Sequence, residues 1–578
     1  MSSDTTYSLR EMPLSLASER ERVSTMLAAN GLRTEALDLY IGVFDQDDRL
    51  LGGGGLCGNV IKCIALDASL RGEAISNTLV SRLRTEARQR GHRNIFIYTK
   101  PENEPLFCSL AFHVIARSPK AVMLESDRRG ISSYCAYLAS LRRDNVDAAA
   151  IVMNCNPLTR GHLYLIEHAA SQCGHLFIIP VMEDKSLFPY RMRLSMMRDA
   201  CSRFDNVTVC DGSPYAVSAV TFPSYFLKCA DDATDTSIQL DLDIFCRHIA
   251  PALGVATRYA GSEPTDALTA RYNELMAEML PKHGLRFREI PRLQADGVSI
   301  SASRVREYLS NGRFAEALAM LAPTSVPYVM AHLATEALER ELSLTPKPGL
   351  VDRTDNGAHT DMDFALMMRS IDALTPGLAA MANAANVADA VARGQEAEKA
   401  MFEATGGVNT HKGAIFCIGI TLLSAMQLYR HGEEISVSAL SATISRLAAE
   451  IADAPTQSHG SEARRRYKVG GALGNAYDGY RRLFESWLPY YRKHRDDRDA
   501  EYKTLLTIMT EIDDTNVLHR AGEEGAKWLK EQSADLLADF SIDRLQAFNT
   551  ECTTRNISPG GAADMLSLTI LIDSITTK

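Results

Sequence analysis

The sequence predicts a multidomain protein in which two α/β domains precede an all-α domain. Its 578 residues exceed the length at which one hydrophobic core stops growing, so several domains are expected. Strand-like runs alternate with helical segments over the first part of the chain, up to about residue 325. Long Ala- and Leu-rich segments of helical period follow without strand patterns. We therefore predict domains at residues 1–140, 145–325 and 326–578.

Composition and charge are those of an ordinary globular protein. The chain is 46% hydrophobic and 23% charged, with a formal net charge of -10. This acidity argues against nucleic acid as a partner, because binding a phosphate backbone normally needs a basic surface. Twelve cysteines occur without a C-x-x-C pair, and the first residues do not resemble a signal peptide. These features predict reduced thiols and a cytoplasmic location.

The most apolar run of the chain is residues 414–426. It is too short to cross a bilayer as a helix. We expect a buried core helix here and no membrane partner.

Residues 35–125 predict a small α/β module. Strand-like runs at 37–44, 60–66 and 94–98 accompany one helix with apolar positions at helical spacing, 75–90. The turn before that helix has backbone N–H groups that could face an anion, although spacing alone favours an ordinary strand-to-helix turn.

Together with Asn103 and Phe107, this module resembles a GNAT acetyltransferase domain. Only residues 71–74 (Arg-Gly-Glu-Ala) match the acyl-CoA pyrophosphate loop of that family. The resemblance implies that a CoA-like group could bind there, but it does not imply acetyl transfer.

Residues 148–182 predict a βαβ unit of a parallel, doubly wound sheet. An apolar strand, 148–153, is followed by a turn, a helix from near Gly161 and a second apolar strand, 175–182. Ligands of such sheets bind beyond the carboxyl ends of the strands. We therefore expect the turn after the first strand to face a ligand.

Two distant segments carry residues suited to a polyphosphate. Residues 156–162 (Asn-Pro-Leu-Thr-Arg-Gly-His) place Thr159 and His162 at the positive end of a helix. Residues 300–306 (Ile-Ser-Ala-Ser-Arg-Val-Arg) open a second helix and add hydroxyls and guanidiniums. Taken singly, His162 is explained as a helix residue and Ser303 as an N-cap. Together, two helix N-termini aimed at one polyphosphate form a coherent anion site.

In this order the two segments resemble the T/H-x-G-H and I-S-x-S/T-x-x-R motifs of the nucleotidylyltransferase superfamily. Residues 183–190 and 215–228 extend the resemblance, over about residues 1–325, to citrate (pro-3S)-lyase ligase. Thr159 stands where many superfamily members have histidine, as is usual in the ligase family.

The ligase resemblance implies that acetate and ATP give acetyl-AMP and pyrophosphate. A prosthetic-group thiol on the lyase acyl carrier subunit then takes the acetyl group. Attack on the α-phosphate needs charge neutralisation and alignment more than acid–base chemistry. The resemblance assigns catalysis to His162, Thr159 and Arg306, and ATP binding to Gly161, Lys185, Arg193, Ser301 and Ser303.

A third segment, residues 345–363, lies between helical segments. Prolines on both sides of Lys347 restrict the backbone and fix where its ammonium points. Asp361 and Asp363 follow His359 and could bind a divalent metal on a nucleotide. A loop lysine followed by helix-capping aspartates is an equally good explanation of this segment alone.

Three further clusters follow this segment in the chain, at residues 406–413, 513–520 and 556–564. Together with residues 345–363 they resemble triphosphoribosyl-dephospho-CoA synthase, an all-helical family. The resemblance extends over about residues 335–575. The resemblance implies that ATP and dephospho-CoA react at the ribose C1 of ATP with release of adenine. A carboxylate can stabilise the cationic ribosyl centre, and Mg²⁺ can bridge the triphosphate to acidic residues. The resemblance assigns catalysis to Lys347, Asp361, Asp363 and Asp514, and binding of Mg²⁺ to the three aspartates among them. It assigns substrate binding to Arg353, His359, His411, Lys412 and Asn516.

One departure affects this expectation. The family commonly has Gly-Ala-Arg-Gly-Glu-Ala where this chain has Gly-Ala-Leu-Gly-Asn-Ala, so Leu473 and Asn475 replace an arginine and a glutamate. The helical domain could therefore be a non-catalytic module that docks lyase subunits or dephospho-CoA. A plain adenylyltransferase with an unrelated helical appendage is another alternative, and a related decarboxylase is another possible client.

Both halves nevertheless converge on one molecule, the phosphoribosyl-dephospho-CoA arm of citrate lyase. The sequence therefore predicts a bifunctional maturation enzyme whose partners are acetate, ATP, dephospho-CoA and the acyl carrier subunit, with neither nucleic acid nor membrane. The enzyme that attaches the arm to the carrier subunit is expected to be a separate protein.

Overall fold

The computed structural model describes residues 7–67, 70, 73–182, 186–215, 225–227, 230–263, 266–295, 298–451 and 471–576. The chain forms two compact units. The first comprises Met1–Cys155, His162–Tyr190 and Cys201–Ser299, and the second comprises Asn156–Gly161, Arg191–Ala200 and Ile300–Lys578.

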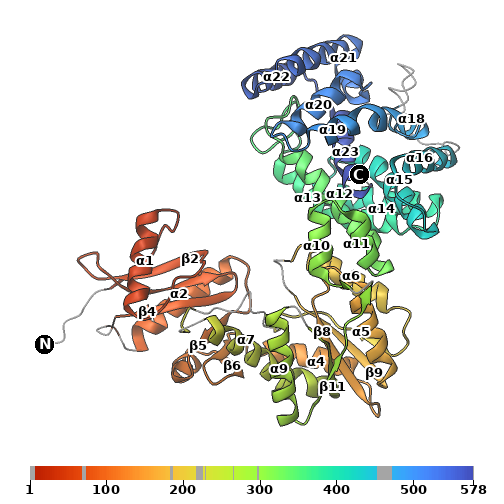
Figure 1. Cartoon of the computed structure of the whole chain (residues 1–578). Coiled ribbons are helices and arrows are strands. Elements are labelled where there is room, and N and C mark those ends of the chain that lie inside the picture. The colour runs from red at the N-terminus through yellow and green to blue at the C-terminus, as the bar shows by residue number, and fades with distance from the viewer. Residues whose placement is uncertain are drawn as a thin grey trace. The chain divides into compact units, whose positions relative to one another are not determined.

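A seven-stranded mixed sheet forms the beginning of the first unit (Figure 1). Its strand order is β1-β2-β3-β4-β5-β7-β6, and only β4 and β5 pair in parallel. Side chains alternate along β2, so Ile41 and Val43 join the core that includes Leu79 and Leu83 of α2, while Tyr40 faces the opposite core. The sheet confirms the predicted α/β module. Its elements are β1 Ser8–Glu11, α1 Ala17–Ala29, β2 Leu39–Phe44, β3 Leu50–Cys57, β4 Val60–Leu66, α2 Glu73–Gln89, β5 Phe96–Thr99, α3 Glu104–Ser109, β6 His113–Arg117, β7 Val122–Glu125 and α4 Gly130–Leu141.

A five-stranded parallel sheet follows, with the order β10-β9-β8-β11-β12. The chain starts at the central strand β8, builds outward to β10, and then returns to the other side of β8. This order confirms the predicted doubly wound sheet, in which the turn after β8 is a favoured place for a ligand. Its strands and the helices between them are β8 Ala148–Met153, α5 Arg160–Ser171, β9 His175–Pro180, α6 Tyr190–Cys201, β10 Val207–Val209, α7 Ala230–Ile244, α8 Ala250–Leu253, β11 Val255–Gly261, α9 Ala267–Lys282 and β12 Arg286–Ile290. A separate antiparallel pair, β13 Gln294–Ala295 and β14 Val298–Ser299, and the helix α10 Ala302–Ser310 follow.

The two sheets of the first unit share one hydrophobic core. Buried polar contacts also join them. The hydroxyl of Tyr215 donates a 2.7 Å hydrogen bond to Glu125 at the end of β7, and the hydroxyl of Tyr225 donates to the carbonyl of Tyr98 on β5 at 3.3 Å. The Arg117 amide donates to Asp243 on α7 at 2.9 Å.

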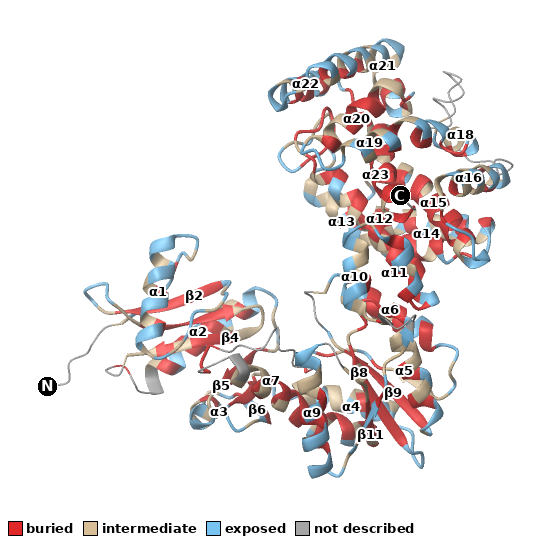
Figure 2. Ribbon diagram, viewed as in Figure 1, coloured by how far each residue is buried: buried red, intermediate tan, exposed pale blue. Residues whose placement is uncertain are grey.

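The second unit is dominated by helices. The structure describes only helices, turns and loops over residues 326–451 and 471–576, which confirms the predicted all-α domain. Figure 2 shows α12, α15 and α23 as mostly buried. The elements are α11 Phe314–Met320, α12 Val326–Ser343, α13 Phe364–Ala382, α14 Val387–Thr405, α15 Lys412–His431, α16 Val437–Ile451, α18 Gly471–Tyr477, α19 Leu488–His494, α20 Ala500–Glu511, α21 Thr515–Ala538, α22 Ile542–Thr554 and α23 Gly560–Ile575.

Helix α15 contains the apolar run at residues 414–426. Within the described part of the chain, it alone is long and apolar enough to cross a membrane, and 72% of its apolar window is buried inside the fold. The predicted core helix is therefore confirmed.

Candidate functional site

The turn after β8 is positioned by the start of α10. A Cβ atom on Gly161 would lie 3.4 Å from the carbonyl oxygen of Ile300, so glycine allows the two segments to approach closely. Thr159 is 1% exposed and forms a β-bridge with Leu321. The two polyphosphate segments predicted from the sequence are therefore neighbours in the fold.

Arg306 links the two segments directly. Its guanidinium donates to the carbonyl of Asn156 at 2.6 Å and to the hydroxyl of Ser303 at 3.1 Å. Burial lowers the pKa of Arg306 from its usual value. An arginine nevertheless stays charged at neutral pH. Arg306 therefore brings a fixed cation to the turn after β8.

The two serines of this segment differ in position. Ser301 is the N-cap of α10, and its hydroxyl accepts from the Arg304 amide at 3.2 Å. Ser303 is exposed in the first turn. The capping role that the sequence suggested for Ser303 therefore belongs to Ser301, which leaves the Ser303 hydroxyl beside Arg306.

His162 is half-buried in the first turn of α5. Burial lowers its pKa to about 4, and the positive charge of Arg292 lowers it further in the same direction. The imidazole is therefore neutral at pH 7, so it can offer a hydrogen bond to a phosphate but not a charge. The motif placed His162 in the site, but the linear sequence could not reveal this burial or its effect on the pKa.

Arg292, which sequence reasoning missed, follows β12 and forms an ion pair with Glu263. The carboxylate of Glu263 is 3% exposed, so the pair is mostly enclosed. Arg193, a predicted ATP ligand on α6, is 0% exposed and makes interactions inside the protein. Lys185, another predicted ligand, lies outside the described residues.

Lys347 lies in the interior of the helical domain and is 2% exposed. Its ammonium donates to Glu341 on α12 at 2.6 Å, and its amide donates to Asp352 at 3.0 Å. Asp352 also accepts from the amides of Thr354 and Asp355, at 2.8 and 2.9 Å. The loop therefore holds Lys347 rigidly, as its two prolines predicted. Its partner Glu341 was not predicted.

His411 lies close to this ion pair. Its Nδ1 atom and the hydroxyl of Ser370 are 2.8 Å apart. Burial lowers the pKa of His411 to about 3, and the charge of Lys347 acts in the same direction. Both predicted residues therefore belong to one buried group, in which the imidazole is neutral.

Asp514 joins the starts of two helices. It caps α21 by accepting from the amides of Asn516 at 2.8 Å and Val517 at 3.3 Å, and it accepts from Ala562 in α23 at 3.0 Å. Burial raises the pKa of Asp514, and the backbone hydrogen bonds oppose this effect. Asn516 lies against α23 as well, since a Cβ atom on Gly560 would be 2.7 Å from its side-chain nitrogen.

A second group of predicted residues lies nearer the surface. His359 and the hydroxyl of Ser558 are 2.8 Å apart, and Asp361 lies 3.8 Å from the other ring nitrogen of His359. The Asp361 side chain is 59% exposed. Arg520 holds this loop by donating to the Ala358 carbonyl at 2.9 Å.

The remaining predicted residues have partners of their own. Asp363 caps α13 by accepting from the Leu366 amide at 2.7 Å, the alternative that the sequence left open. Arg353 donates to Ser343 at 2.9 Å. Lys412 pairs with Glu398 at 2.5 Å.

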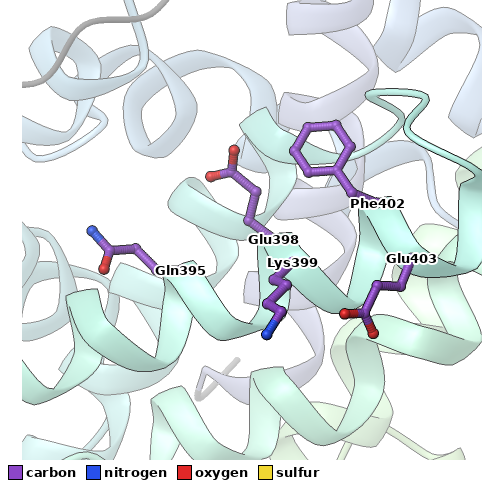
Figure 3. Close-up of a pocket in the computed structure, with 5 residues that line it drawn as sticks. All are labelled: Gln395, Glu398, Lys399, Phe402 and Glu403. Carbon is purple, nitrogen blue, oxygen red and sulfur yellow. The ribbon is translucent and has the colours of Figure 1, made fainter.

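A hollow of about 540 Å³ lies along one side of α14. Figure 3 shows the side chains that line it. Glu398, the partner of Lys412, is one of its lining residues, but none of the predicted site residues lines it. Its lining is mostly acidic or neutral, which does not suit a triphosphate. The lining residues are Gln395, Glu398, Lys399, Phe402 and Glu403.

No group of three or more His, Cys, Asp and Glu side chains is arranged as a preformed metal site within the described ranges. Asp361, Asp363 and Asp514 therefore do not form a metal-binding cluster by themselves. A carboxylate that binds Mg²⁺ together with a triphosphate does not require such a cluster.

The segment with the two uncharged replacements forms helix α18. The carbonyl of Asn475 accepts from the amide of Tyr480 at 2.7 Å, in the turn that ends this helix. Tyr480 has a φ of 53°, in the left-handed region that a tyrosine rarely adopts. The side chain of Tyr480 lies in the interior of the helical domain and is 2% exposed.

Residues 148–329 match the family model described as citrate lyase ligase C-terminal domain, and residues 327–578 match the model described as ATP:dephospho-CoA triphosphoribosyl transferase. The citrate (pro-3S)-lyase ligase of Klebsiella pneumoniae is 38% identical over 316 residues, which cover 54% of this chain and 92% of the relative. The Escherichia coli ligase is 36% identical over 324 residues, covering 55% and 90%.

A protein of Stutzerimonas stutzeri named "Probable 2-(5''-triphosphoribosyl)-3'-dephosphocoenzyme-A synthase" is 38% identical over 267 residues, which cover 43% of this chain and 91% of the relative. The helical region is therefore not an unrelated appendage.

Proposed function

Because this chain belongs to the citrate (pro-3S)-lyase ligase family and, in its helical part, to the triphosphoribosyl-dephospho-CoA synthase family, we propose that it is a bifunctional enzyme of citrate lyase maturation. One observation carries the proposal. The chain covers 92% of a ligase and 91% of a synthase, so each family is represented over nearly its whole length.

The ligase half activates acetate with ATP and transfers the acetyl group to the thiol of the lyase acyl carrier subunit. An acetate oxygen attacks the α-phosphorus of ATP, and the bond to pyrophosphate breaks. Arg306, held at the Asn156 carbonyl, provides a fixed cation for the phosphates. His162 donates a hydrogen bond from its neutral ring. The acetyl group then passes from acetyl-AMP to the thiol, and AMP leaves.

The synthase half joins ATP to dephospho-CoA at the ribose C1 of ATP and releases adenine. The buried group around Lys347, His411 and Asp514 supplies a cation, a neutral imidazole and a carboxyl for the reaction. Backbone amides engage both carboxylate oxygens of Asp514 but only one oxygen of Asp363, and the Asp361 side chain is largely exposed, so Asp361 and Asp363 are better placed to hold Mg²⁺. Bound Mg²⁺ would neutralise charge on the triphosphate.

The substrates and location follow from this assignment. Dephospho-CoA, ATP and acetate are cytoplasmic metabolites, and the client is a carrier protein with a thiol arm. The described cysteines are all free thiols, in agreement with a reducing compartment.

Two assays on the purified full-length chain test the proposal. Incubation with ATP, Mg²⁺ and dephospho-CoA should release adenine only when dephospho-CoA is present. Incubation with ATP, Mg²⁺, acetate and the thiol-bearing carrier subunit should form AMP only when acetate is present. Absence of adenine alongside acetate-dependent AMP would reduce the chain to a ligase with a docking domain. Absence of both products would overturn the proposal.

A further inference from the structure

Asp564, which has no role assigned above, lies beside the buried group of the helical domain. It is on the second turn of α23 and is partly accessible. A Cβ atom on Gly413 would be 2.1 Å from its carboxylate oxygen, so the glycine at the start of α15 makes room for it. No hydrogen bond or ion pair joins the carboxyl of Asp564 to the described residues. It differs in this respect from Asp514, which backbone amides hold.

The groups that face Asp564 come from several elements. Glu341 on α12 and Asp514 at the start of α21 both act on its charge. Cys417 on α15 and Tyr480 after α18 lie close enough for Asp564 to affect their own ionisation. Lys347 is the cation of this group, but it is bound to Glu341.

The hydroxyl of Tyr480 is an independent sign of a missing ligand. It is buried and has no hydrogen-bond partner among the described residues. An unsatisfied buried hydroxyl costs about 1–3 kcal/mol, and the left-handed backbone of this tyrosine adds about 1 kcal/mol or more. Such costs persist when a group serves a ligand. Asp564, whose carboxyl also lacks a partner among the described residues, is near enough to this hydroxyl to interact with it electrostatically.

We propose that Asp564 is the general acid that protonates the departing adenine, and that Tyr480 hydrogen-bonds to the base. This inference rests on the synthase function proposed for the helical domain. The bond between adenine and the ribose C1 breaks, its electron pair passes to the base, and the Asp564 carboxyl gives its proton to a ring nitrogen. A hydroxyl of dephospho-CoA forms the new bond to C1, and its proton restores the carboxyl, so no proton is consumed overall.

The electrostatics suit this role. Burial raises the pKa of Asp564 well above its usual range, and the charges of Glu341 and Asp514 act in the same direction. The carboxyl therefore binds its proton more tightly than an exposed aspartic acid does. Asp514 keeps its negative charge more readily, because backbone amides stabilise it. When two neighbouring carboxyls have different environments, one can act as the general acid while the other stays ionised and stabilises positive charge.

The test compares three variants of the full-length chain. Asp564→Asn should lower adenine release by about 100-fold or more, the usual contribution of a general acid. Tyr480→Phe should lower adenine release by about 10-fold without lowering the melting temperature, because the hydroxyl it removes makes no bond in the free protein. Asp543→Asn, at an exposed position on α22, should leave adenine release within about twofold of wild type.

Acetate-dependent AMP formation, measured on the same samples, reports whether the ligase half is intact, and the melting temperature reports whether the helical domain of each variant is folded. The pH profile adds a second readout. Adenine release by the wild type should fall as pH rises through the raised pKa of Asp564, and Asp564→Asn should lack that alkaline decline.

If the wild type releases adenine but Asp564→Asn retains a third or more of the rate, or keeps the same pH profile, the inference is wrong while the synthase function stands. A Tyr480→Phe variant as active as wild type would remove the tyrosine from the proposal. If the wild type releases no adenine, the synthase function itself is wrong, and the inference falls with it.

Discussion

The ammonium of Lys347 is neutralised by the carboxylate of Glu341, with 2.6 Å between their atoms and both side chains almost fully buried. A phosphate that binds Lys347 must therefore share it with this carboxylate. The lysine is fixed in place and available only to a ligand that reaches the interior.

Removing one member of this pair should destabilise the helical domain. Lys347→Met leaves Glu341 as an unpaired buried charge, so we expect a loss of about 3–5 kcal/mol in the free energy of unfolding and no adenine release. The double variant Lys347→Met/Glu341→Gln should recover most of the stability but not the activity. Urea denaturation and adenine chromatography measure the two effects. Lys527→Met, at an exposed lysine, is the matched control, and adenine release by the double variant would show that Lys347 has no catalytic role.

His411 should make the protein sensitive to acid. Its pKa is about 3 in the folded chain and about 6.5 when unfolded, so between these values only the unfolded state binds the proton. Stability is therefore complete above pH 6.5 and falls as pH decreases towards 3, by on the order of 3 kcal/mol at pH 4.

Melting temperatures of wild type and His411→Asn between pH 7 and 4 measure this effect, and the variant should show the smaller decline. His431→Asn, at an exposed histidine, should decline like wild type. Parallel curves for wild type and His411→Asn would contradict the assignment of a depressed pKa.

Arg306 should separate the two activities. Arg306→Gln removes the cation held at the Asn156 carbonyl, and we expect acetate-dependent AMP formation to fall by about 100-fold, a usual cost of losing one charge-stabilising donor. Adenine release should be unchanged within about twofold. Arg304→Gln, two residues earlier and exposed, should affect AMP formation much less. Equal losses in the two variants would mean that general positive charge, and not the position of Arg306, supports the reaction.

Tyr215 should stabilise the first unit. Its hydroxyl donates to the buried carboxylate of Glu125, and hydrogen bonds to charged groups contribute about 1.5–3 kcal/mol. Tyr215→Phe should lower the free energy of unfolding by this amount, as measured by urea denaturation. Tyr477→Phe changes an exposed tyrosine and should have no measurable effect. A Tyr215→Phe variant as stable as wild type would show that water replaces the lost hydrogen bond.

The sequence patterns predicted helices and strands more accurately than they predicted the surroundings of individual side chains. The apolar run of β8 and the period of α15 determine local structure, so both were predicted correctly. The motif beginning at Ile300 predicted a helix start, but spacing alone could not tell which serine caps it. Glu341 lies on an Ala- and Leu-rich helix and gave no sign of function, because its burial comes from tertiary packing.

The same limit applies to ionisation. His162 and His411 were predicted as site residues from motifs, but their low pKa values depend on neighbours that the linear sequence does not identify. Asp564 lay within a recognised cluster without an assigned role, and Tyr480 gave no signal at all. A glycine opposite a carboxylate, as Gly413 is to Asp564, becomes informative only when the two helices are seen together.

The junction between the ligase and synthase regions contains no free spacer. The Ala322 amide donates to the Leu158 carbonyl at 3.3 Å, and the hydroxyl of Tyr328, on the first synthase helix, donates to Asp199 on α6. The turn that bears Thr159 thus packs against the chain that begins the second catalytic region. If a ligand bound in one region changes the affinity for a ligand in the other, thermodynamic reciprocity requires the second ligand to change the affinity for the first by the same factor. Two separate enzymes would not share these contacts.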